Sequence, residues 1–231
     1  MGNRAPLRDG RERSPLSYRR VIETALGFVD RQGLEALSMR KLGAELGVEA
    51  MSLYNHVPNK DAIVQGIVEL VLDEIEIPPE GAGDWTDRLK QMALSFRDIA
   101  LAHPNVFPLL VKETRCTPSV MRPLEAALRS LDHAGISGRD ALYAYRAAVG
   151  FIMGYLNAHI SGFLSDPIEL RERSEELERL PVDEFAEVHQ HIPFIVRSDS
   201  EAEFLFGLDI FLAGLEQYLS SPVRAGASGR R

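Results

Sequence analysis

The sequence predicts an all-α protein with a small N-terminal three-helix unit and a larger helical C-terminal unit. Apolar residues recur every three or four positions along most of the chain, the spacing of one face of an α-helix, and no convincing β-strand alternation is found. The Pro- and Gly-rich residues 77–83 (IPPEGAG) interrupt this pattern and predict a joint between the two units. The composition, 45% hydrophobic and 26% charged, is typical of a folded globular protein.

Helix start and stop signals divide the N-terminal unit, which we place at residues 17–77. Ser38 is suited to cap a helix because its hydroxyl can accept a hydrogen bond from a free backbone N–H group. Gly47 stands where the same helix needs a left-handed residue to end. Pro58 disfavours helical geometry at the residue before it, so a third helix is predicted over residues 49–56. The other expected helices run from Tyr18 to Gly33 and onward from Asn59.

The C-terminal unit, which we place at residues 84–220, is expected to hold several long helices. One of these helices has two apolar faces and carries no charged residue from position 147 onward. It therefore needs packing partners on both sides. The charged residues 171–179 are expected to form a mobile or weakly helical excursion. The predicted helices cover residues 85–101, 124–131, 142–160 and 204–218.

The net charge of −8 is unevenly distributed along the chain. Residues 1–60 hold ten Lys and Arg against seven Asp and Glu, whereas the remainder holds sixteen against twenty-seven. A basic N-terminal part on an acidic body is compatible with a nucleic-acid partner. Residues 1–16 are expected to form a flexible basic arm, which either meets phosphate or is a solvated tail, and residues 221–231 to form a disordered tail.

One stretch, residues 147–165, approaches the length of a membrane span. Asn157 and His159 interrupt it, so a helix buried by protein is expected instead. Cys116 is the single cysteine, which excludes an intrachain disulfide, and the first residues lack the apolar core of a secretory signal. We therefore expect a cytoplasmic protein without a membrane partner.

Residues 38–60 (SMRKLGAELGVEAMSLYNHVPNK) predict a helix-turn-helix. Two short helices flank Gly47, and Leu42, Leu46 and Leu53 can pack between them. The second helix of such a motif presents its outward side chains to base edges in the major groove of double-stranded DNA. The candidate DNA-binding residues are Ser38, Arg40, Lys41, Glu49, Ala50, Met51, Ser52, Tyr54, Asn55, His56 and Lys60.

The segment GLEALSMRKLGAELGVEAMSLYNHVPNKDAI resembles the DNA-binding domain of the tetracycline-repressor (TetR) family, and HPNVFPLL resembles part of the family's C-terminal domain. The resemblance implies that residues 49–52 read bases, and that the DNA backbone is contacted by Arg40, Tyr54, His56 and Lys60. Packing of Tyr54 and His56 against a neighbouring helix is the alternative. Ala50 and Met51 replace a polar residue and a proline of the family's type member, so its base preference cannot be carried over.

Dimerisation is expected because one helix-turn-helix buries little surface on DNA, and specific recognition normally pairs two across half-sites. Small residues form smooth patches on two apolar helices where a symmetry-related helix could approach, although packing within one chain also explains them. The candidate interface residues are Gly150, Gly154, Gly207, Phe211 and Gly214.

A mostly apolar pocket for a small-molecule effector of unknown identity is expected in the C-terminal unit. Polar-tipped side chains in an apolar helix could be satisfied by a ligand, or by ordinary hydrogen bonds to the backbone. The candidate ligand-binding residues are Phe107, Met121, Phe151, Tyr155, Asn157 and His159. No metal-ligand set or cofactor motif is found, so neither a metal nor a cofactor is expected.

The sequence therefore predicts a ligand-responsive transcription regulator, by family default a repressor, that binds a palindromic operator as a homodimer and is released by a small molecule. A helical protein-interaction module that does not bind DNA is the alternative. An enzyme is a weaker alternative, because zinc-ligand spacing, a phosphate loop and a nucleophile elbow are all missing.

Overall fold

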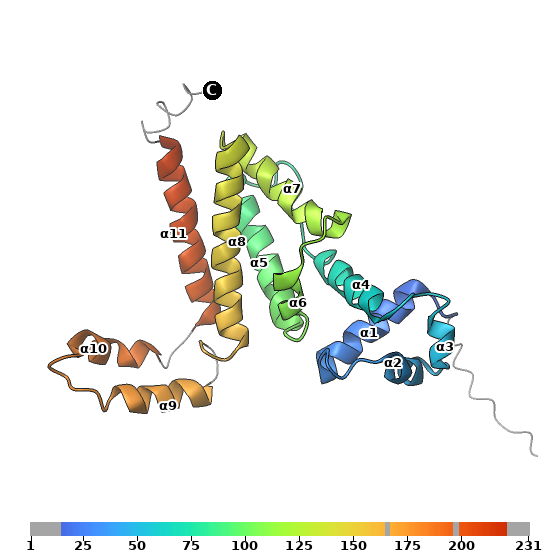
Figure 1. Ribbon diagram of the computed structural model, residues 1–231. Helices are drawn as coiled ribbons and strands as arrows, with labels where there is room; N and C mark the ends of the chain where they lie inside the picture. Colours follow the sequence, from blue (N-terminus) through green and yellow to red (C-terminus); the bar gives the residue numbers. More distant parts are fainter. Residues whose placement is uncertain (1–14, 165–166, 196–198, 221–231) are drawn as a thin grey trace, which may run out of the picture. The chain divides into compact units, whose positions relative to one another are not determined.

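The computed structural model describes residues 15–164, 167–195 and 199–220. Within these ranges every regular element is a helix, which confirms the predicted all-α class (Figure 1). The chain divides into two compact units, residues 1–67 and 68–231. The division falls within a helix, ten residues before the expected joint at residues 77–83. The expected arm and tail lie almost entirely outside the described residues.

The N-terminal unit is organised by the capping residues that the sequence singles out. Its helices are α1 (Tyr18–Gln32), α2 (Met39–Leu46), α3 (Ala50–Leu53) and the first part of α4 (Lys60–Leu72). The Ser38 hydroxyl accepts a hydrogen bond from the backbone N–H of Lys41 at 3.3 Å. Gly47 ends α2 in the left-handed conformation, with φ 70° and ψ 34°. These capping predictions are therefore confirmed.

The third helix is shorter than the predicted residues 49–56, since α3 spans only Ala50–Leu53. The backbone N–H of Tyr54 bonds to the carbonyl of Met51, three residues back, so the chain tightens into a turn. Val57 precedes Pro58, which disfavours the helical conformation there. The tight turn therefore replaces the second half of the expected helix.

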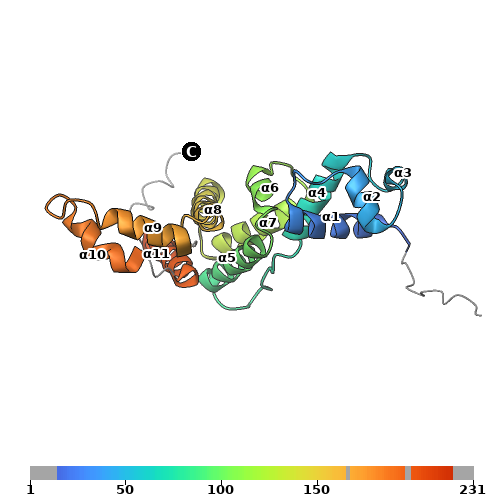
Figure 2. The same cartoon turned by 90° about the horizontal axis from the view of Figure 1, so that it is seen from below.

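The C-terminal unit is built around α8, which contacts α5, α7 and α11. Figures 1 and 2 show α11 running beside α8, and α9 beside α10. The expected need of α8 for several partners is confirmed. The elements of this unit are α5 (Trp85–Ala102), α6 (Phe107–Lys112), α7 (Pro118–His133), α8 (Gly138–Ile160), α9 (Pro167–Leu177), α10 (Ala186–Ile195) and α11 (Ser200–Ser220).

Two helices of the C-terminal unit are missing from the predicted set. Both α6 and α10 contain a proline, Pro108 and Pro193, and both are short. Pro108 stands in the first turn of α6, where a missing N–H group costs no helical hydrogen bond. The charged residues 171–179, predicted to be mobile or weakly helical, lie mostly in the helix α9. Arg171 and Glu175 of this helix form an ion pair at 3.4 Å.

Candidate functional site

The two helices of the helix-turn-helix pack closely because α2 carries a glycine at their contact. A Cβ atom on Gly43 would lie 2.9 Å from the carbonyl oxygen of Val48 and 3.2 Å from the backbone N of Ala50. Leu42 and Leu53, both fully buried, fill the apolar contact beside it. The chain at the start of α3 therefore lies directly on α2, and this close packing fixes which side chains of α3 face outward.

The outward face of this motif holds most of the predicted DNA-binding residues. Met51 is 72% exposed and Tyr54 is 47% exposed, although both are large side chains. Arg40, Lys41, Glu49 and Asn55 are also exposed, whereas the partly buried members are Ala50, Ser52 and His56. The exposure of Tyr54 is high for an aromatic residue and agrees better with a surface contact than with core packing.

Ser38 and Lys60 differ from the rest of the predicted set. The Ser38 side chain caps α2, as described above, and the Lys60 Nζ donates a hydrogen bond to the Leu34 carbonyl at 3.4 Å. Both side chains are partly buried and hold the local backbone. Any contact that they make with DNA adds to this structural role.

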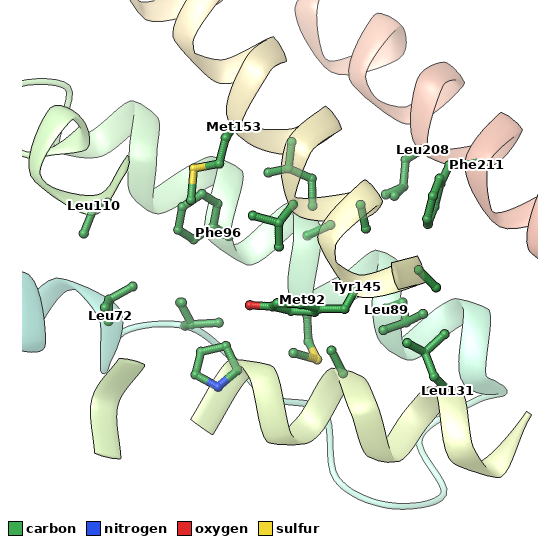
Figure 3. Close-up of a pocket in the computed structure, with 18 of the residues that line it drawn as sticks. Leu72, Leu89, Met92, Phe96, Leu110, Leu131, Tyr145, Met153, Leu208 and Phe211 are labelled. Carbon is green, nitrogen blue, oxygen red and sulfur yellow. The ribbon is translucent and has the colours of Figure 1, made fainter. Parts of the chain in front are cut away.

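The C-terminal unit contains a partly open cavity of about 320 Å³ (Figure 3). It is lined almost entirely by apolar side chains from the end of α4 and from α5, α6, α7, α8 and α11. The labelled side chains of Leu89, Phe96, Met153 and Phe211 surround it. Its size and lining are those of a site for a small, largely apolar molecule.

Two polar side chains interrupt the apolar wall of this cavity. Figure 3 shows the phenolic oxygen of Tyr145 pointing into the space, and burial raises the pKa of this phenol. Glu113 has a side chain that is only 10% exposed, and its Oε1 accepts a hydrogen bond from the backbone N–H of Arg115 at 2.6 Å. Tyr145 is therefore a protonated hydrogen-bond donor near neutral pH, while the Glu113 carboxylate is already held by its own loop.

None of the six residues predicted to bind a ligand lines this cavity. Phe107 is 1% exposed in the core, Met121 lines a different groove, and Asn157 is exposed. Phe151 stacks on Phe204, with ring centroids 5.8 Å apart. The cavity is therefore formed by residues other than the predicted set, in which Phe107 and Phe151 pack within the chain.

The Tyr155 hydroxyl is hydrogen-bonded along the α8–α11 contact, and the His159 ring lies beside the Tyr155 ring. The Tyr155 hydroxyl donates to the Ser200 carbonyl at 2.8 Å, and burial together with the nearby Glu203 carboxylate raises its pKa to about 12. The His159 ring lies 6.5 Å from the Tyr155 ring, and burial, followed by the Arg97 charge, lowers its pKa. The alternative of ordinary internal hydrogen bonding thus applies to Tyr155.

The predicted interface residues fall into two groups. Gly150, Gly154 and Gly214 have open space where a side chain would be. Gly207 instead lies against the Phe151 ring of the same chain, and Phe211 lines the cavity. Three large apolar residues outside the predicted interface set are also exposed on α8 and α11. They are Tyr143, Phe206 and Ile210, at 58%, 69% and 58% exposure.

The described residues contain neither a metal-binding cluster nor a helix that could span a membrane. Among those residues, no group of three or more His, Cys, Asp or Glu side chains is arranged to hold a metal ion. None of the described helices combines the length and apolarity needed to cross a lipid bilayer.

Comparisons with known proteins match both units. Residues 21–67 match the family described as "Bacterial regulatory proteins, tetR family", and residues 77–219 match "Tetracyclin repressor-like, C-terminal domain". The class C tetracycline repressor of Escherichia coli is 30% identical over 200 residues, which cover 85% of this chain and 89% of that protein. A helix-turn-helix transcriptional regulator of Saccharopolyspora erythraea is 29% identical over 153 residues, which cover 66% of this chain and 65% of that regulator, slightly less than two thirds of its length.

A solved structure extends the similarity to three dimensions. ActR of Streptomyces coelicolor in complex with actinorhodin has a TM-score of 0.78 to this chain at 30% identity, with coverage of 90% of this chain and 100% of ActR. The chain therefore combines a helix-turn-helix in one unit with an apolar cavity in the other. The chain belongs to the TetR family of bacterial transcription regulators.

Proposed function

We propose that this protein represses transcription by binding a palindromic operator as a homodimer, and that a small molecule in the cavity of the C-terminal unit releases it. The observation that carries this proposal is the apolar cavity in a chain that also presents a helix-turn-helix. We assign DNA binding to residues 17–77, and effector binding and dimerisation to residues 84–220. Enzymatic activity is not part of the proposal, and we place the protein in the cytoplasm.

The exposed face of the helix-turn-helix supports the assignment of DNA contacts. Tyr54, His56 and Arg40 are the residues that we assign to phosphate contacts, which fix the position of the protein on DNA. Glu49 and Met51 are exposed at the start of α3, where side chains of a recognition helix reach base edges. The Met51 side chain can make apolar contact with a thymine methyl group.

The outer faces of α8 and α11 support dimerisation. Small residues there leave room for a close helix approach, and exposed large apolar residues beside them would lose their contact with water. A dimer brings two DNA-binding units to one operator, as half-site recognition requires.

Release from DNA follows if the effector binds more tightly to a state that does not fit the operator. The helix α4 is a physical route for this effect, because it carries Ile63 and Ile67 of the N-terminal core and ends with Leu72 in the cavity wall. The effector that fits the cavity is largely apolar and carries a hydrogen-bond acceptor for the Tyr145 hydroxyl. The complex of ActR with actinorhodin supports a small organic effector.

The test begins with selection of genomic DNA fragments that bind the purified protein, followed by fluorescence anisotropy with the selected operator. We expect a palindromic site, two protomers per site, an affinity that falls steeply with salt, and release by an apolar effector. Salt-independent binding, or the lack of any preferred sequence, would contradict the proposal and favour a helical protein-interaction module instead.

A further inference from the structure

Arg88 on α5 is a buried positive charge. The residue is only 6% exposed, and its Nε has no hydrogen-bond partner. Among the described residues, no carboxylate lies within ion-pairing distance of its guanidinium group. A guanidinium group stays protonated in proteins, and a buried charge without a partner is costly. A bound anion would therefore neutralise the Arg88 guanidinium group and stabilise the protein.

The Arg88 side chain lines a groove of about 650 Å³ between α5, α7 and residues 77–80. Two more arginines line this groove, but both are already neutralised. Arg122 pairs with Asp73 at 2.7 Å, and Arg129 pairs with both Glu80 and Glu125 at 3.0 Å. Hydrogen bonding to Arg129 is the main cause of the lowered pKa of Glu80, so this carboxylate is ionised and engaged. Arg88 is the groove arginine without an ion pair among the described residues, although its charge also helps to lower the pKa of Glu80 and the three arginines lie near three carboxylates in all.

The rest of the groove wall is apolar. It includes Pro78, Pro118, Met121 and Ala126. A molecule bound there would combine one negative charge for Arg88 with an apolar body for this wall. A carboxylate suits the planar guanidinium group because it can accept two parallel hydrogen bonds. A doubly charged phosphate would bring excess negative charge beside Glu80 and Glu125.

We propose that this groove binds a small organic monocarboxylate through Arg88. The site goes beyond the effector cavity, because the two share none of their lining residues. The helix α7 separates them, with Pro123 and Ala127 on the cavity side and Met121 and Arg122 on the groove side.

Benzoate is a suitable probe because it combines a carboxylate with an apolar ring, and benzamide is its neutral counterpart. Trp85, the single tryptophan of the chain, packs against the apolar core and does not line the groove, so calorimetry is the measurement of choice. We expect saturable binding of benzoate by calorimetry, with at least tenfold weaker binding of benzamide and of inorganic phosphate. Equal binding of benzoate and benzamide, or tighter binding of phosphate, would overturn the proposal.

Three variants locate the site. Arg88→Gln should weaken benzoate binding at least tenfold, because it removes the charge that the carboxylate meets. Arg122→Gln is the matched control, since it removes a groove arginine that is already paired, and should change the affinity less than threefold. Tyr145→Phe, which alters the effector cavity, should leave benzoate binding unchanged.

Thermal unfolding must show that the variants fold. If Arg88→Gln does not fold, Arg88→Lys keeps the charge and should retain the preference for benzoate over benzamide at a weaker affinity. Unchanged benzoate affinity in folded Arg88→Gln, or loss of the preference in Arg88→Lys, would refute the role of Arg88.

Discussion

Gly43 and Val48 hold the helix-turn-helix together through a backbone contact, since a Cβ atom on Gly43 would lie 2.9 Å from the Val48 carbonyl oxygen. Backbone atoms cannot move aside as a flexible side chain can. A larger residue at position 43 therefore has to separate α2 from the start of α3, next to Met51 and Tyr54, which we propose to contact DNA.

Gly43→Val is expected to destabilise the protein by about 1–3 kcal/mol and to weaken DNA binding, because the side chain overpacks the contact between α2 and α3. Urea unfolding and operator titration measure the two effects. Gly27→Ala is the control, since a Cβ atom there meets only the Arg31 guanidinium at 3.4 Å. Replacing this helical glycine should be neutral or stabilise by up to about 1 kcal/mol. Equal effects of the two changes would contradict the packing argument.

Tyr54→Ala is expected to weaken the binding of specific and nonspecific DNA alike, by about 1 kcal/mol or fivefold per protomer, because a phosphate contact carries no sequence information. Anisotropy titrations with operator and random duplexes at several salt concentrations provide the measurement. Met51→Ala is the comparison, and it should change the preferred sequence while leaving nonspecific binding unaltered. Loss of specific binding alone in Tyr54→Ala would place this residue among the base-reading residues.

Local signals in the sequence predict the N-terminal unit well. Ser38, Gly47 and Asn59 act through their own short-range geometry, and the structure shows each of them as a helix cap or stop. The packing role of Gly43 was not predicted, because nothing in the sequence distinguishes a glycine that lies against another backbone from one that faces solvent. Its role depends on the packing of two helices, which periodicity does not specify.

The apolar cavity of the C-terminal unit also depends on tertiary packing, which the sequence pattern does not specify. Its lining residues, such as Leu89, Phe96 and Ile152, have the composition and spacing of an ordinary core, so the sequence does not reveal that space remains between them. The predicted ligand-binding set instead included polar side chains of α8. The hydroxyl of Tyr155 bonds to Ser200, 45 residues away in the chain, which only the tertiary structure can show.

Ala148→Phe should abolish the response to the effector while leaving operator affinity within about twofold, because the added ring fills cavity volume at a cost of about 1–3 kcal/mol in stability at most. Anisotropy with the operator, with and without effector, tests this expectation. Ala102→Phe adds the same ring at an exposed position of α5 and should leave the response unchanged. Release of DNA by the effector at its normal concentration in folded Ala148→Phe would place the effector outside this cavity.

Tyr145→Phe should lower effector affinity about fivefold, the effect of one lost hydrogen bond of about 1 kcal/mol. The wild-type affinity should stay constant between about pH 6 and pH 9. Burial raises the pKa of Tyr145 above its ordinary value, so the phenol remains a neutral donor throughout this range and is lost as a donor only at higher pH. Calorimetric titration with an effector that does not itself ionise provides the test. A decline that begins below pH 9 and disappears in Tyr145→Phe would contradict the raised pKa.

Gly150→Glu should convert the proposed dimer to monomers by weakening the association more than about a hundredfold. The new carboxylate would lie unpaired between two α8 helices, and a buried unpaired charge costs about 3–5 kcal/mol. Light scattering during gel filtration measures the oligomeric state, and operator binding should weaken in parallel because each monomer reaches only one half-site. Thr114→Glu adds the same charge on the exposed segment between α6 and α7, and should remain dimeric. If Gly150→Glu keeps the wild-type mass at micromolar concentration, then the outer face of α8 is not the dimer interface.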